Sequence, residues 1–153
     1  MGLDMYLEMI PKDKEPKTAK EYFDKSEAAY ESGLDYDTEV AYWRKANAIH
    51  NWFCKHCECL ESEVLYKVTR EDLLRLIGTI CRVLNASEVD PETNLIKDSS
   101  MAQELLPTCN GFFYGSTEYD NWYLDKLEDS IVELGKALSS LEDNQTLFYY
   151  ASW

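Results

Sequence analysis

The spacing of hydrophobic positions divides the chain into strand-like and helix-like segments. Residues 3–7 alternate imperfectly between apolar and polar side chains, which predicts a first strand. Residues 146–153 are mostly apolar and aromatic and predict a final strand. Because an aromatic terminal strand needs cover, we expect the first and last strands to pair near the centre of a sheet.

Two segments in the first half of the chain follow the helical period. Residues 38–55 predict a strong helix, whose core-facing residues have 4-3-4 spacing: Tyr42, Ala46, Ile49 and Phe53. Residues 61–68 predict a second strand. Thr69 and Asp72 then resemble a capping box, which predicts a helix running to about residue 84. Its expected buried stripe is Leu73, Ile77, Ile80 and Leu84.

The second half predicts one short and one long helix. Residues 100–106 form the short helix, which ends before Pro107. Thr117 is a suitable N-cap for the longest helix, residues 118–142. Its apolar residues follow a heptad-like spacing: Leu124, Leu127, Ile131, Leu134, Leu138 and Leu141. Gly135 interrupts this helix, and we expect a close backbone crossing there.

These segments predict one α+β domain over residues 1–153. We expect a small, mostly antiparallel sheet of three or four strands, packed against three or four helices. Residues 8–37 are a possible variable insertion, within which residues 18–31 predict a short polar helix.

Charge narrows the possible partners. The chain has 15 Lys and Arg against 29 Asp and Glu, a formal net charge of −14. Such a charge disfavours binding to nucleic acid or to anionic membranes and favours basic protein surfaces, including the channels of nucleic-acid-binding nucleases. A second interpretation is that the charge only keeps the protein soluble. We expect a cytoplasmic protein, because neither a signal peptide nor an apolar run of 18 residues is found.

Four sequence blocks carry a resemblance. They are residues 1–7 (MGLDMYL), 40–53 (VAYWRKANAIHNWF), 106–123 (with GFFYGSTEYDNWY) and 148–153 (FYYASW). The chain resembles a family of small, uncharacterised accessory proteins of bacteriophages and prophages. The resemblance implies a protein that acts in the cytoplasm of a bacterial host, and it supplies neither a reaction nor catalytic residues.

Our leading hypothesis is a non-enzymatic protein that binds and inhibits a host factor, as an anti-CRISPR-like inhibitor of a defence nuclease does. Its expected contact surface is the acidic face of the long helix, formed by Asp125, Glu128, Asp129 and Glu133. The alternative for these residues is an ordinary solvated face.

A second hypothesis is a binding protein or sponge for a nucleotide signal. Trp43, Asn47 and His50 are expected to share one face of helix 38–55, with Arg44 and Asn51 beside it. The turn Gly115, Ser116 and Thr117 is a possible anion site at the start of the long helix. The same residues are also consistent with a buried polar network or with a partner contact.

Metal binding and catalysis have weaker support. His50, Cys54, Cys57 and Cys59 are candidate zinc ligands, but they come from one segment rather than from two separated knuckles. The five cysteines are expected to be free thiols. No P-loop, paired-glycine nucleotide fingerprint or nucleophile elbow occurs, so we expect no cofactor and no enzymatic activity. An enzyme of unknown reaction, dependent on His50, stays a third alternative.

Overall fold

The computed structural model describes residues 2–17, 21, 24, 38–58 and 61–153. Within these residues the protein has a four-stranded antiparallel sheet and four α-helices, which confirms the α+β fold. The expected polar helix of residues 18–31 lies almost wholly outside the described residues. Residues 8–11, the start of the expected variable insertion, belong to the first strand.

The sheet places both ends of the chain at its centre. Its strands are β1 (Asp4–Pro11), β2 (Glu39–Arg44), β3 (Tyr66–Val68) and β4 (Gln145–Ser152). They lie in the order β2-β1-β4-β3, and every neighbouring pair is antiparallel. β1 pairs with β4 from Asp4 opposite Ser152 to Pro11 opposite Gln145. The expected central pairing is therefore confirmed, whereas the predicted strand 61–68 is much shorter.

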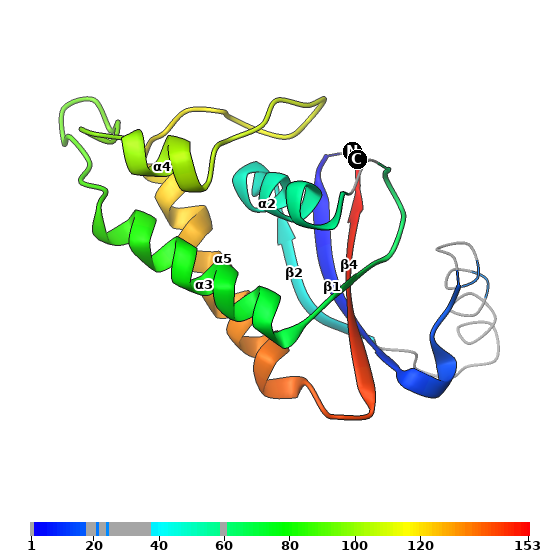
Figure 1. Cartoon of the computed structure of the whole chain (residues 1–153). Coiled ribbons are helices and arrows are strands. Elements are labelled where there is room, and N and C mark those ends of the chain that lie inside the picture. Colours follow the sequence, from blue (N-terminus) through cyan, green and yellow to red (C-terminus); the bar gives the residue numbers. More distant parts are fainter. Residues whose placement is uncertain (1, 18–20, 22–23, 25–37, 59–60) are drawn as a thin grey trace.

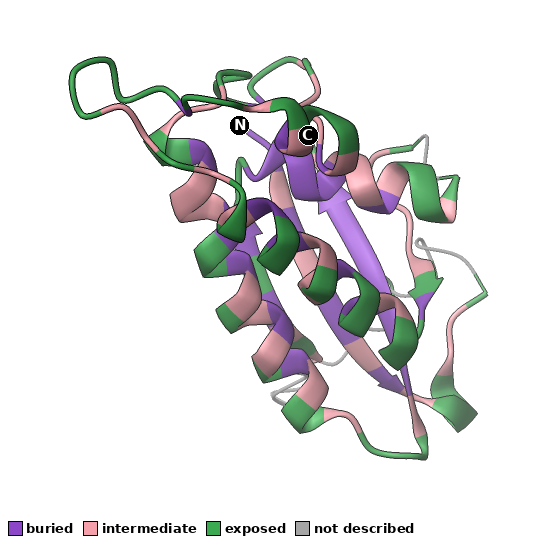
Figure 2. Cartoon of the chain, turned by 60° about the vertical axis from the view of Figure 1, so that its left-hand side comes forward, coloured by how far each residue is buried: buried purple, intermediate pink, exposed green. Residues whose placement is uncertain are grey.

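The helices pack on one face of the sheet, as Figure 1 shows. They are α2 (Asn47–Cys57), α3 (Arg70–Asn85), α4 (Ser100–Leu105) and α5 (Asn121–Ser140). α3 and α5 lie side by side, and Figure 2 shows their exposed residues directed away from the buried sheet. Phe53 of α2 stacks on Tyr149 of β4 with ring centroids 4.1 Å apart. None of the described helices is both long and apolar enough to cross a bilayer.

The start of α3 follows the sequence closely. The Thr69 hydroxyl accepts a hydrogen bond from the backbone N–H of Asp72 at 3.1 Å. The Asp72 carboxylate accepts one from the backbone N–H of Thr69 at 2.8 Å. This capping box is the predicted one. The buried stripe differs in part, because Leu76 and Val83 are fully buried with Leu73 and Ile80, while the predicted Ile77 and Leu84 are only half-buried.

The helix predicted for residues 38–55 is wrong in its first half. Residues 39–44 form the edge strand β2, and α2 begins only at Asn47. Tyr42 therefore does not face the core as expected and is 40% exposed, although Ala46, Ile49 and Phe53 are buried. The helical spacing from Tyr42 to Phe53 spans a strand and a helix that meet at a sharp turn.

Two predictions about the long helix are also corrected. Its N-cap is Asp120, whose carboxylate accepts from the N–H of Tyr123 at 3.0 Å, rather than Thr117. A Cβ added at Gly135 would meet nothing within 4 Å, so no close backbone crossing exists there.

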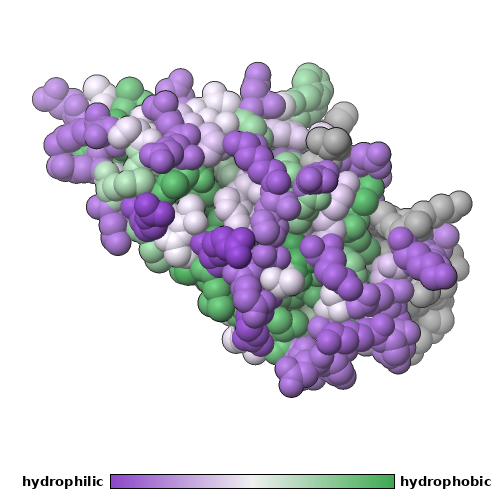
Figure 3. Space-filling model, viewed as in Figure 1, coloured by the Kyte–Doolittle hydropathy of each residue, from purple (hydrophilic) through white to green (hydrophobic). Residues whose placement is uncertain are grey.

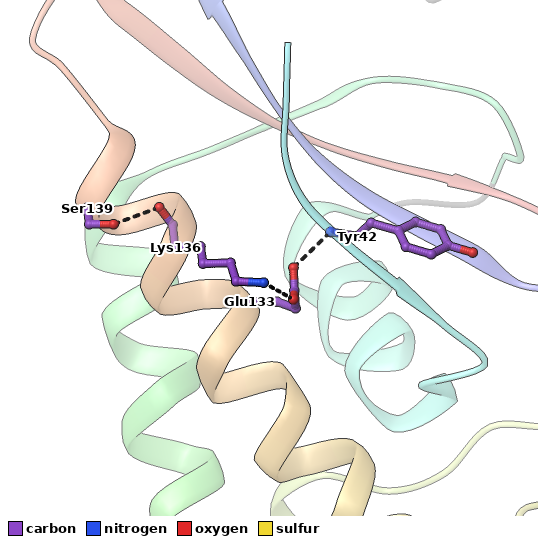
Figure 4. A network of polar contacts seen from close by, with 4 residues as sticks. All are labelled: Tyr42, Glu133, Lys136 and Ser139. Carbon is purple, nitrogen blue, oxygen red and sulfur yellow. Dashed lines mark hydrogen bonds and ion pairs between the residues drawn. The ribbon is translucent and has the colours of Figure 1, made fainter. Parts of the chain in front are cut away.

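One carboxylate of the expected acidic face connects α5 to the edge of the sheet. Glu133 accepts from the backbone N–H of Tyr42 at 3.1 Å and from Nζ of Lys136 at 2.8 Å (Figure 4). Ser139 donates to the carbonyl oxygen of Lys136 one turn further on. Glu133 thus pairs a backbone donor of the edge strand β2 that would otherwise face solvent.

Replacing Glu133 by Ala should therefore reduce the free energy of unfolding by about 1 kcal/mol, because the N–H of Tyr42 loses a charged acceptor. Glu128→Ala is the matched control, since Glu128 is an exposed acid of the same helix, and its effect should stay within about 0.5 kcal/mol. Urea unfolding measures both. Equal effects of the two variants would show that Glu133 does not support the edge strand.

Candidate functional site

A cleft of about 330 Å³ lies where β2, α2 and α5 meet. Its first wall is the end of β2 and the first turn of α2, residues 44–49. The opposite wall is the N-terminal part of α5, and the loop that precedes α5 closes one end with Gly115 and Ser116. A cleft of this volume is at the small end of the range for ligand pockets.

Three basic side chains converge on this cleft, namely Arg44, Lys45 and Lys126. Arg44 pairs with Asp4 of β1 at 3.4 Å. Neither lysine has an ion-pair partner among the described residues. In a chain with nearly twice as many acids as bases, these two lysines are the positive charges that the cleft offers to a ligand.

The turn between β2 and α2 fixes the position of Lys45. Lys45 has φ +56°, in the left-handed region that residues with a side chain rarely adopt. Its N–H donates to the carbonyl oxygen of Leu3 at 2.8 Å, which ties the turn to β1. Gly115, with φ +90°, faces the Lys45 side chain so closely that an added Cβ would lie 3.4 Å from the Cβ of Lys45.

The first turn of α2 also lines the cleft. Its N-cap is Ala46, which offers no side-chain acceptor, and the first intrahelical bond runs from the N–H of His50 to the carbonyl of Ala46 at 3.0 Å. The N–H groups at the start of a helix carry partial positive charge and need acceptors. They add to the positive potential produced by the three basic side chains.

Asn47 holds the loop against α2 rather than presenting its amide to the cleft. Its Nδ2 donates to the carbonyl oxygens of Tyr114 at 3.2 Å and Ser116 at 2.9 Å. Its Oδ1 accepts from the N–H of Cys109 at 3.2 Å. Asn51 similarly donates to the carbonyl oxygen of Pro107 at 2.9 Å. Both amides therefore belong to the polar network that the sequence offered as one interpretation.

His50 does not line the cleft and lies in an aromatic cluster. It is 2% exposed, with Nδ1 at 2.5 Å from the hydroxyl of Tyr149 and Nε2 at 3.4 Å from the hydroxyl of Tyr114. The Trp153 ring lies edge-on to the His50 ring, with ring centroids 4.9 Å apart. Burial lowers the pKa of His50 to about 4, so the imidazole is neutral at pH 7.

The expected shared face of Trp43, Asn47 and His50 is therefore wrong. Trp43 belongs to β2, is buried against Phe53, and its indole N–H has no hydrogen-bond partner in the described part of the chain. Thr117 is exposed and does not line the cleft, although its carbonyl oxygen accepts from Thr108 at 3.0 Å.

Four of the predicted ligand residues do line the cleft, and the sequence missed several others. These four are Arg44, Asn47, Gly115 and Ser116, and the principal further lining residues are Lys45, Trp122 and Lys126. Trp122 and Lys126 are four residues apart, so they lie on one face of α5. Two acids complete the polar lining, Glu118 and the N-cap Asp120.

The acidic face of α5 is not uniform. Glu128 and Asp129 are exposed, whereas Asp125 and Glu133 are half-buried. Val132, on the same helix, is 57% exposed. Figure 3 shows that hydrophilic side chains cover most of the visible face, with hydrophobic surface in patches between them.

The candidate metal ligands do not form a site within the described residues, which hold no group of three or more His, Cys, Asp or Glu suited to a metal ion. The Sγ atom of Cys54 lies 3.3 Å from Nε2 of His50, and Cys57 is half-buried. Cys59 lies outside the described residues.

The buried His50 predicts a specific dependence of stability on pH. The unfolded chain binds a proton with a pKa near 6.5 and the folded chain with a pKa of about 4. His50 therefore costs no stability above pH 6.5, and about 3 kcal/mol is lost as the pH falls from 6.5 to 4. Below pH 4 the loss stops growing.

Urea unfolding of the wild type and His50→Gln over this range tests the prediction. The difference between the two proteins isolates His50, because every other ionisable side chain is the same in both. A difference that does not change between pH 6.5 and 4 would contradict the buried, neutral imidazole.

Comparison with known proteins assigns no family to this fold or cleft. No family model, curated protein or solved structure matches the chain. The resemblance to phage accessory proteins therefore stays a prediction, and the function must be argued from the site.

Proposed function

We propose that the protein binds a small ligand through an anionic group, such as a phosphate, in the cleft between β2, α2 and α5. The observation that supports this most is the meeting of Arg44, Lys45 and Lys126 with the uncapped first turn of α2. Helix N-termini and basic side chains are the two groups that proteins use most often to hold phosphate.

The charges around the cleft favour this assignment. Two acids also line it, but the Asp120 carboxylate is already engaged with the N–H of Tyr123 at the start of α5. Glu118 is exposed. An anion bound at the α2 end of the cleft would neutralise positive charge that the described protein residues leave unpaired, as they do for Lys45 and Lys126.

The lining supports binding rather than turnover. Among the described residues it contains no histidine or cysteine, and the nearby His50 is buried, neutral and committed to tyrosine hydroxyls. Among the described lining residues, no serine or threonine hydroxyl is hydrogen-bonded to a carboxylate that could act as its general base. For a phage protein, as the resemblance implies, such a site suits the sequestration of a host metabolite or signal.

Replacing Lys126 by Ala should weaken the binding of an anionic probe about tenfold, because one charged contact in the cleft is lost. Lys136→Ala is the matched control, since Lys136 lies on the same helix, outside the cleft. Calorimetric titration with ribose 5-phosphate measures both affinities. Unchanged or equally reduced affinities in the two variants would place the anion elsewhere, and no binding to the wild type would refute the proposed function.

A second candidate function is the docking of a basic host protein on α5. It is supported by the exposed pair Glu128 and Asp129 beside the exposed apolar Val132. Charge complementarity of this kind mainly speeds association and sets specificity. The surface would serve the inhibitor function that the resemblance and the net charge of −14 suggest.

If a basic host protein docks on α5, the wild type should capture a partner with a basic surface from bacterial host lysate. A variant with both Glu128 and Asp129 changed to Lys should no longer capture it. Glu71→Lys with Glu92→Lys is a control of equal charge change on exposed acids outside α5. Loss of the partner with both pairs would indicate a nonspecific charge effect. Retention with both would exclude this face of α5.

A further inference from the structure

We infer that the ligand is a nucleoside phosphate whose base stacks on Trp122, an inference that rests on the proposed anion site. Trp122 is 68% exposed at the start of α5 and lines the cleft. Within the described part of the chain its indole makes no ring contact and no hydrogen bond. A large aromatic side chain left in solvent beside a basic cleft has a free face available for a flat ring.

Trp122 is not needed to close the core of the domain. The neighbouring Tyr123 performs that role, because it is buried and its hydroxyl donates to the carbonyl oxygen of Leu106 at 2.8 Å. Trp122 instead shares a face of α5 with Lys126. The same helix therefore offers one aromatic surface and one positive charge to a single ligand.

The rest of the lining matches the remaining parts of a nucleotide. Ala46, Ala48, Ile49 and Leu127 supply an apolar floor, which a bare phosphate does not require. At the rim, the exposed Glu118 carboxylate and the hydroxyl of Ser116 can exchange hydrogen bonds with the hydroxyl groups of a sugar. Acidic side chains recognise ribose hydroxyls in this way in dinucleotide sites. The volume of about 330 Å³ favours one nucleotide over a longer chain.

Calorimetric titration of the full chain with the four ribonucleoside 5′-monophosphates, ribose 5-phosphate and inorganic phosphate tests the inference. At least one nucleotide should bind about tenfold more tightly than ribose 5-phosphate, as expected for stacking of one base on an aromatic ring. Trp122→Ala should remove that advantage, because it should weaken the binding of the nucleotide much more than that of ribose 5-phosphate. Trp122→Phe should restore part of it, and Val132→Ala, an exposed apolar residue of α5 outside the cleft, should have no effect.

The outcomes separate this inference from the proposed function. If ribose 5-phosphate binds as tightly as every nucleotide, or if Trp122→Ala weakens both equally, base stacking is refuted and the anion site stands. If none of the probes binds to the wild type, both are refuted. Circular dichroism and thermal melting of each variant distinguish a lost contact from a lost fold.

Discussion

β1 and β4 pair along their whole length, so the two ends of the chain form the centre of the sheet. The buried face of these strands is the surface against which the helices pack. The same pairing builds the cleft, because the start of β1 lies beside the turn that leads into α2. Leu3 accepts from the N–H of Lys45, and Asp4 pairs with Arg44. The core and the wall of the cleft formed by β2 and α2 thus both depend on β1, which pairs with β4 along its whole length.

Asn47 provides the second constraint, because it fixes the loop before α5 to the first turn of α2. All its side-chain contacts go to backbone groups of residues 109–116, with both amide atoms engaged. His50, one turn later, reaches Tyr114 of the same loop and Tyr149 of β4. Neutral hydrogen-bonded groups at these positions keep the loop in place without adding charge. The cleft is therefore preorganised by an uncharged network, and its positive charge is left to the residues that face the ligand.

The features that could be predicted have a signal in a short segment or in the composition of the two chain ends. The capping box of α3 depends on two residues three positions apart, and the central pairing follows from the apolar character of both chain ends. The break between β2 and α2 has no such signal. The residue with the left-handed conformation is Lys45, which is neither a glycine nor an asparagine, and no proline lies nearby. The sequence pattern therefore predicts a helix where Trp43 lies in β2. Trp122 and Lys126 were missed because only the packing of α5 beside β2 brings them to the cleft.

An anion site in a protein with a net charge of −14 needs a physical reason. Salt screens both the attraction of the basic residues and the repulsion of the acidic surface beyond about a Debye length, roughly 8 Å at physiological salt, so the charges nearest a bound group dominate. A nucleic acid that placed one phosphate in the cleft would bring its other phosphates near the surface of a protein whose net charge is −14. A free nucleotide has no further phosphates along a chain, so it interacts mainly with the charges that line the cleft. Under the proposed function, the acidic surface therefore acts as a filter that admits a small anion and rejects a polyanion, and the charge that first argues against phosphate binding sets its specificity.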